Sequence, residues 1–298
     1  MTGLRKFIKR NCKLFFADKG MVLTSLITPL ILLVLYATFL AKVYRDSFAS
    51  AIPAGFAIPD DLIDATVGAQ LFSSLLAVSC VTVAFCSNML MVQDKVSGAR
   101  KDLCVSPVKA STLAVGYYVS TLISTLAVCL IATGAGLVYL AAVGWYLTLS
   151  DVGLLLLDVL LLTMFGTVLS SIVNSFLTSQ GQISAVGTVV SAGYGFLCGA
   201  YMPISNFGDG LQKALGFLPG TYGTSLIRNH ALRGVFAEMQ SIGFPDEVVT
   251  GIRRSIDCDL SFFGNPVTET AMYLILGGSV LALLLVYVAI HVMKQRRG

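Results

Sequence analysis

Long apolar stretches alternate with short polar ones along this chain. A membrane-spanning helix needs about 20 predominantly apolar residues. Six stretches approach or exceed that length, and we predict that they run over residues 21–41, 69–92, 113–140, 152–173, 182–201 and 271–292. The pattern therefore indicates an all-α integral membrane protein with six transmembrane helices, folded as a single transmembrane domain over residues 1–298.

The third stretch is ambiguous because its apolar character persists from Ser111 to Leu147. Two short spans joined by a turn would place the two basic chain ends on opposite sides of the membrane. Lys and Arg concentrate in cytoplasmic segments, so that arrangement is disfavoured. We predict one helix here, with Trp145 and Tyr146 in the aromatic belt of the far interface.

Basic residues then define the orientation. The segment through Gly20 carries six Lys or Arg residues, the loop 93–110 carries four, and the C-terminal tail carries three. The opposite side has only Lys42 and Arg45 in its first loop, and the five in the long segment 202–268 count little, because long translocated segments escape the rule. We predict a plasma-membrane protein whose N- and C-termini are both cytoplasmic.

Residues 3–19 predict a helix that lies along the membrane rather than across it. Leu4, Phe7, Ile8 and Phe15 recur at helical spacing, and basic residues fill the positions between them. Such a helix places its apolar face in the lipid and its basic face near anionic headgroups. The alternative is a topology signal with no further role.

The loop 93–110 predicts a second short amphipathic helix, between the second and third spans. It must end before Ser106-Pro107, because proline pushes the preceding residue out of the helical region. A helix in this place suits docking to a cytosolic partner. The alternative is a solvated basic loop.

The segment 202–268 is long for a connection, and long connections are usually functional or disordered. Its first half is apolar and is punctuated by Pro203 and Pro219, so we predict two short re-entrant helices that dip into the outer leaflet. Its polar second half would form a small external lobe. Whether Cys258 in this lobe pairs with Cys198 stays open.

Asp158 is the one acidic residue inside the predicted spans. An intramembrane carboxylate is a candidate functional group, so both a structural role and a role in transport stay open. The fifth span carries Gly187, Ser191, Gly195 and Gly199 at intervals of four residues. Small residues at this spacing let helices approach closely, either within the subunit or at a subunit interface or pathway wall.

Composition and missing motifs exclude most other classes. Hydrophobic residues make up 56% of the chain and charged residues 12%, about half the charged share of a soluble domain. The balance of 20 basic to 16 acidic residues does not suit a nucleic-acid binder. The sequence lacks a G-x-x-x-x-G-K-[ST] phosphate loop, an H-E-x-x-H pair and a G-x-S-x-G elbow. We therefore predict no catalytic residue and no metal site on this chain.

The order of these elements resembles that of the membrane subunit of type-2 ABC exporters, the ABC-2 permeases. One patch is the inner loop, where Gly98, Asp102, Leu103, Ser106 and Pro107 resemble the family's loop pattern, although Gln93-Asp94-Lys95-Val96 replaces its usual glutamate-rich lead. The second patch resembles the proline-framed segment after span five; its residues are Met202, Pro203, Leu211, Leu218, Pro219, Thr221, Tyr222 and Arg228.

The resemblance implies a permease subunit that is not itself an enzyme. A second permease subunit, identical or different, and separate ABC ATPase subunits would complete the transporter, and ATP and Mg would bind to the ATPase. The inner loop would be the coupling helix. Spans two and five would line the path, with residues drawn from Phe72, Leu76, Phe85, Met89, Tyr194 and Phe196.

The apolar and aromatic path residues favour export of a hydrophobic drug, antibiotic or peptide. Export of a lipid-linked molecule or a polysaccharide is the alternative within the family. An ion-coupled secondary carrier that uses Asp158, and a membrane anchor for a cytosolic complex, are the alternatives outside it.

Overall fold

The computed structural model describes residues 2–35, 39, 41–51, 59–105 and 109–296. Within these residues the fold is helical apart from one two-stranded antiparallel hairpin. The elements are α1 Thr2–Ala17, α2 Lys19–Leu35, α3 Ala41–Ala51, α4 Asp60–Ser87, α5 Met89–Val96, α6 Ala99–Val105, α7 Ala110–Val143, α8 Leu149–Phe176, α9 Gln180–Leu197, η2 Ile204–Asn206, α10 Asp209–Leu215, α11 Pro219–Ser241, α12 Asp246–Ser255, β1 Ser261–Phe262, β2 Asn265–Pro266 and α13 Glu269–Arg296.

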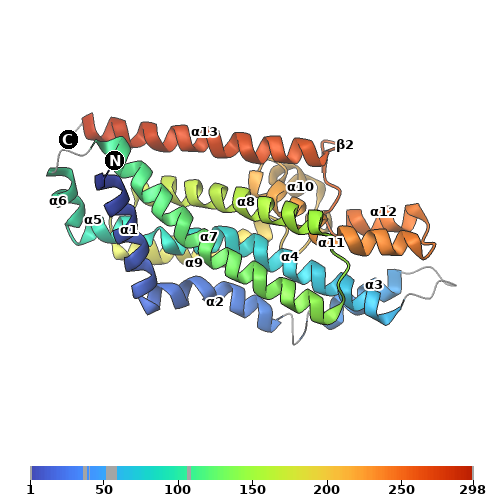
Figure 1. Ribbon diagram of the computed structural model, residues 1–298. Coiled ribbons are helices and arrows are strands. Elements are labelled where there is room, and N and C mark those ends of the chain that lie inside the picture. Colours follow the sequence, from blue (N-terminus) through green and yellow to red (C-terminus); the bar gives the residue numbers. More distant parts are fainter. Residues whose placement is uncertain (1, 36–38, 40, 52–58, 106–108, 297–298) are drawn as a thin grey trace.

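The long helices form one elongated bundle (Figure 1). Helices α1, α5 and α6 lie at the same end of the bundle as the last turns of α13, and we call this the α6 end. Helix α12 and the β1–β2 hairpin lie toward the opposite end, which we call the α12 end.

Four helical segments in the described part of the chain are long and apolar enough to cross a membrane. They run over Asp60–Val96, Ser111–Val143, Leu149–Phe176 and Glu269–Met293, and each contains one predicted span. Helix α7 is continuous from Ala110 to Val143, which confirms one helix rather than two short spans. The two other predicted spans correspond to α2 with 17 residues and α9 with 18, and residues 36–38 and 40 of the first lie outside the described residues.

Helix α4 forms the centre of the bundle and packs against α7, α8 and α11. In the most apolar stretch of the segment Asp60–Val96, which contains α4, 83% of the residues are buried inside the subunit. The contact with α8 is close because Gly166 has no side chain. A Cβ at this position would lie 2.8 Å from the Cys80 carbonyl oxygen. Small residues therefore set the spacing of the core helices, as is common in membranes.

Helix α11 is longer than the two short helices expected after span five. Helix α10 has seven residues, but α11 has 23 and packs against α4, α8 and α13. Pro219 does not interrupt a helix. It stands in the first turn of α11, where the backbone N–H that proline lacks would have no partner within the helix. Polar residues of α11 such as Arg228 and His230 have hydrogen-bond partners inside the bundle, so α11 is part of the bundle interior.

Helix α1 is amphipathic as predicted, but part of its apolar face packs on protein rather than on lipid. The Phe7 ring lies 4.9 Å from the Tyr117 ring of α7, and Phe15 is only 1% exposed. Gly116 makes room for this contact, since a Cβ there would lie 2.6 Å from the Phe7 ring. Leu14 and Phe16 remain exposed. The helix is therefore fastened to the bundle.

Candidate functional site

Of the predicted coupling residues, Gly98 lies between α5 and α6, and Asp102 and Leu103 lie on α6. Gly98 adopts a φ of +83°, which is easy for glycine and strained for other residues, and turns the chain from α5 into α6. Asp102 is exposed, whereas Leu103 packs partly buried against a small cluster that includes Met91 and Tyr117. Helix α6 ends at Val105. Ser106 and Pro107 lie outside the described residues.

Helix α5, which leads into α6, is held by an ion pair with α1. Arg10 donates two hydrogen bonds of 3.0 Å to the two carboxylate oxygens of Asp94. Tyr117 of α7 donates a third, of 2.8 Å, to the same carboxylate. The hydrogen bond with Asp94 raises the pKa of Arg10, against the opposing effect of partial burial. Three helices therefore meet at one buried carboxylate, four residues before Gly98.

Helix α5 is also fixed to the end of α8. Lys95 Nζ donates to the carbonyl oxygens of Asn174, Ser175 and Leu177 at 2.7, 3.0 and 2.9 Å. The last carbonyls of a helix have no partner within the helix, so a cation here satisfies them and complements the helix dipole. Asn88, between α4 and α5, donates to the Ser170 and Ser171 hydroxyls of α8. Asn88 and Lys95 thus connect the start and the end of α5 to α8 through hydrogen bonds.

The structure separates the six predicted path residues into two groups. Phe72, Leu76 and Phe85 are buried in the core of the subunit, with exposed fractions of 4%, 0% and 5%. Met89 and Tyr194 are partly buried, and Phe196 is half exposed. The six side chains therefore do not share one surface of the isolated subunit.

A groove with a volume of about 470 Å³ lies between α2, α5 and α9, and Met89 lines it. Helix α9 contributes the polar wall through Gln180, Ser184 and Thr188, which recur every four residues and are exposed. Of all α9 residues, only Ile183 and Gly195 are buried. The Ser184 and Thr188 hydroxyls each donate to a carbonyl oxygen one turn earlier in α9, at 3.2 and 2.9 Å, and each hydroxyl oxygen can also accept a hydrogen bond from a group outside the subunit.

The segment after α9 is organised by a buried arginine. Arg228 is 1% exposed and donates to the carbonyl oxygens of Ile256 at 2.6 Å and Gly199 at 2.8 Å. Asp257 lies 3.8 Å from Arg228 and accepts backbone N–H bonds from Ile204 and Ser205. Burial raises the pKa of Asp257, although Arg228 and the two amides act in the opposite direction. Arg228 therefore links the end of α9 to the turn after α12.

The other predicted residues of this segment have structural positions around it. Pro203 precedes the single turn of η2, and Pro219 begins α11. Tyr222 is 4% exposed and donates to the Gly216 carbonyl oxygen at 2.6 Å. Together they fold the chain back into the bundle.

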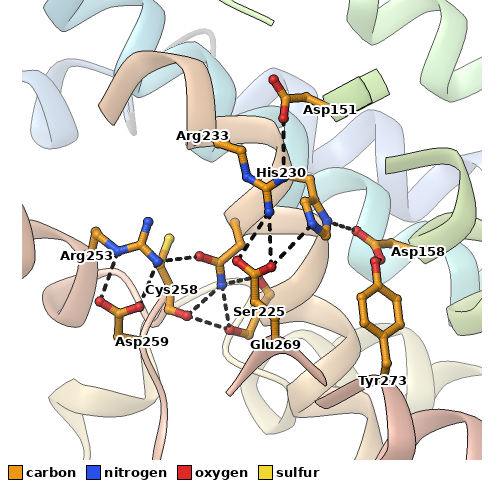
Figure 2. Close-up of polar contacts among 11 residues, drawn as sticks. Asp151, Asp158, Ser225, His230, Arg233, Arg253, Cys258, Asp259, Glu269 and Tyr273 are labelled. Atoms are coloured by element: carbon orange, nitrogen blue, oxygen red, sulfur yellow. Dashed lines mark hydrogen bonds and ion pairs between the residues drawn. The ribbon is translucent and has the colours of Figure 1, made fainter. Parts of the chain in front are cut away.

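Asp158 is paired with His230, a partner that the residues around Asp158 do not predict (Figure 2). Its Oδ2 lies 2.5 Å from Nδ1 of His230 on α11, and Tyr273 of α13 donates to its Oδ1 at 2.6 Å. Asp158 and His230 are both buried, at 0% and 1% exposed. The carboxylate thus joins α8, α11 and α13 in the interior.

The network extends from His230 toward the surface. His230 Nε2 lies 3.9 Å from Glu269, and Arg233 bridges Glu269 at 3.0 Å and Asp151 at 3.5 Å (Figure 2). His230 and Arg233 are three residues apart, so they share one face of α11. This spacing is the signal for the network that the sequence contains, but it does not identify Asp158 or Glu269 as the partners.

Two cysteines whose pairing was left open are both free thiols. Cys198 and Cys258 are buried, and burial raises the pKa of the Cys258 thiol to about 12. The Cys258 carbonyl oxygen accepts from Asn229, whose own oxygen accepts from Arg253 (Figure 2). In the described part of the chain, no three His, Cys, Asp or Glu side chains are grouped to hold a metal ion.

One family model matches the chain, over residues 2–231, and its description is ABC-2 type transporter. No curated protein matches the chain. The matched residues include α1, α6, α9 and the first half of α11, whereas α12, the hairpin and α13 follow them.

Proposed function

This chain belongs to the ABC-2 type transporter family as a multi-pass membrane subunit without ATPase activity of its own, and we propose that it forms the path of an ATP-driven exporter. Two permease subunits, identical or different, would assemble with separate ABC ATPase subunits that bind ATP and Mg. The cargo we propose is a hydrophobic drug, antibiotic or peptide.

The proposed coupling element is α6 with its flanking turn, represented by Gly98, Asp102, Leu103, Ser106 and Pro107. A displacement of α6 would be transmitted directly to α5, since only Ser97 and Gly98 separate the two helices. From α5 it reaches α1 through Arg10 and α8 through Lys95. This is a contiguous chain of charge-assisted bonds, and such chains can carry coupling between distant sites.

The observation that carries the proposed path is the exposed polar face of α9 beside the 470 Å³ groove. We infer that this face meets a second subunit and that cargo passes between the two. Met89 and Phe196 stand at or near this surface, and Tyr194 lies partly behind it. Phe72, Leu76 and Phe85 belong to the buried core of the subunit and do not line this groove.

The proposed topology places the α6 end in the cytoplasm, since both basic chain ends and the basic loop 93–110 gather there (Figure 1). Helix α2 with the residues up to 41, and α9 with the residues up to 201, would complete six spans. Segment 202–268 would then be external. The whole of residues 1–298 would act as one permease domain.

The environment of Asp158 favours a structural role for this residue over an ion-coupled carrier. Its two oxygens are engaged by His230 and Tyr273, and it is fully buried on α8. The groove is lined from α2, α4, α5 and α9, so Asp158 is not one of its lining residues. An ion pathway through Asp158 would need a separate entrance.

The test is purification of the tagged protein from its native membrane in mild detergent, with identification of the proteins that copurify. We expect a stoichiometric ABC ATPase subunit, and Asp102→Arg should reduce its recovery about tenfold, because repulsion at a docking contact costs more than 1 kcal/mol. Asp209→Arg is the matched control, since Asp209 is also an exposed residue in the first turn of a seven-residue helix, at a different place.

A chain that purifies alone and still transports in ATP-depleted vesicles would refute the exporter assignment. Equal loss of the ATPase subunit from both variants would refute the coupling role of α6 while leaving the exporter assignment in place.

A further inference from the structure

Two cavities adjoin each other beside the β1–β2 hairpin. The first has a volume of about 610 Å³ and a largely polar rim that includes Ser205, Gln212, Arg254 and Thr268. The second has a volume of about 430 Å³. Both are lined by Gly216, Tyr222, Pro266 and Val267, so they form two halves of one cleft, which we call the hairpin cleft.

The polar half carries one uncompensated positive charge. Its two carboxylates are engaged, since Asp257 faces Arg228 and two backbone amides, and Asp259 accepts two hydrogen bonds from Arg253. Arg254 also lines the cavity, is exposed, and makes no ion pair with any residue that the structure describes. A guanidinium in this position favours a phosphate or carboxylate group.

The second half of the cleft is apolar and borders a membrane span. Its walls include Phe217, Phe262, Ala271 and Ile275, the last two on the first turns of α13. Ile275 is 37% exposed, and its neighbour Leu274 is 71% exposed, so this face of the span is directed toward lipid. The apolar half is thus reached from the hydrocarbon side.

Exposed aromatic rings mark the level of the membrane surface at this place. Phe217 and Phe263 are 66% and 56% exposed, and their ring centroids lie 6.1 Å apart. The Phe262 ring packs against both, at 5.1 and 4.7 Å. Phenylalanine rings favour the lipid, whereas the Lys213 ammonium group, 5.7 Å from the Phe263 ring centroid, favours water, so this cluster stands near the boundary between the two. The polar half of the cleft therefore lies on the water side of this boundary and the apolar half on the lipid side.

We propose that the hairpin cleft binds an anionic amphiphile. Arg254 takes the acidic headgroup, and the apolar chain runs along Phe262 and Ile275 toward the lipid. A membrane phospholipid and an amphipathic cargo share this chemistry. Arg254, Phe262 and Ile275 all follow residue 231, whereas Gly216 and Tyr222 on the other wall lie in the part of the chain that matches the family. Binding at this cleft goes beyond the proposed exporter function and requires no ATPase subunit.

The test is native mass spectrometry of the purified chain with phosphatidylglycerol, phosphatidylcholine or dodecyl phosphate added in increasing amounts. We expect an anionic ligand to bind at least tenfold more tightly than phosphatidylcholine, and Arg254→Gln to weaken the anionic ligand about tenfold. Lys42→Gln is the charge-matched control, because Lys42 is also exposed but lies on α3 and does not line either half of the cleft.

A second pair of variants tests the apolar half. Ala271→Trp fills the cavity and should abolish binding of the anionic ligand, whereas Leu274→Trp on the neighbouring lipid-facing position should leave it unchanged. Phosphatidylglycerol binding identifies a membrane lipid as a sufficient ligand. Selective binding of dodecyl phosphate alone identifies a single-chain amphiphile instead.

Equal affinity for phosphatidylcholine, or unchanged affinity in Arg254→Gln, would overturn the proposal. Arg254 is exposed, so its replacement is expected to fold normally. Failure of this test leaves the copurification test untouched, since no ATPase subunit takes part.

Discussion

Helices α4 and α9 have similar compositions of small, apolar and hydroxyl residues, and both were predicted to line the transport path. Helix α4 is enclosed by α7, α8 and α11 and buries most of its residues. Helix α9 packs mainly along α4 and buries only Ile183 and Gly195. The contrast shows that an apolar helix with small residues suits two opposite positions. Helix α4 occupies the centre of the subunit, and α9 occupies an edge where we propose that a second subunit binds.

The largest effect should come from filling the tightest contact of α4. Gly166→Val would place a side chain against the Cys80 backbone, where the obstacle is main chain and cannot move aside. We expect a loss of about 3 kcal/mol or more of stability, measured as thermal unfolding in detergent, with little monodisperse protein recovered.

Gly193→Val on α9 is the control, because nothing lies within 4 Å of a Cβ at that position. It should stay within about 0.5 kcal/mol of the parent. Equal damage from both substitutions would remove the distinction between a buried α4 and an exposed α9.

Asp158→Asn should give the next largest effect. It replaces the carboxylate that both His230 Nδ1 and the Tyr273 hydroxyl contact, and disturbing a buried hydrogen-bonded group of this kind typically costs about 1–3 kcal/mol. We expect a lower midpoint of thermal unfolding, while the fraction that folds keeps its ATP-dependent transport. Normal stability together with lost transport would instead assign Asp158 to the transport path.

Lys95→Met should have a smaller effect, about 1–2 kcal/mol, because it removes the cation that satisfies three carbonyl oxygens at the end of α8. Stability again provides the measurement. Gln180→Met, an exposed change at the start of α9, should be close to neutral. If Lys95→Met proved equally neutral, the link between the coupling region and α8 would carry little energy.

The smallest change in stability is expected for Ala192→Cys on the exposed face of α9. In the assembled transporter this cysteine should form a crosslink to a second subunit, detected as a dimer on a non-reducing gel. The native Cys80, which is 0% exposed on α4, should neither crosslink nor react with a maleimide. Modification of Cys80 as fast as of Ala192→Cys would contradict the enclosed position of α4.

Local patterns predicted the parts of the fold that depend on neighbours in sequence. Charge placement indicated one helix across residues 111–140, and Ser106-Pro107 indicated where α6 must end; both agree with α7 and α6. Helix α4 begins before the predicted span at residue 69, because Asp60 and Asp61 start the helix outside the apolar stretch.

Long-range pairing could not be predicted in the same way. Asp158 and His230 are 72 residues apart, and Arg10 and Asp94 are 84 apart. The apolar first half of segment 202–268, which contains Arg228 and His230, was predicted only to dip into the outer leaflet, and the partners that make burial of these two side chains acceptable are distant in sequence. The burial of Phe72 and Leu76 depends on which helices surround α4, and no property of α4 alone specifies those helices.

The pairing of Asp158 also has a consequence for the order of biosynthesis. Ribosomes complete α8 before α11 and α13 exist, so the carboxylate of Asp158 is made before either His230 or Tyr273. Until those helices arrive, α8 carries a polar group that the bilayer disfavours. A nascent chain that stops short of α11 therefore displays an unmatched acid inside the membrane.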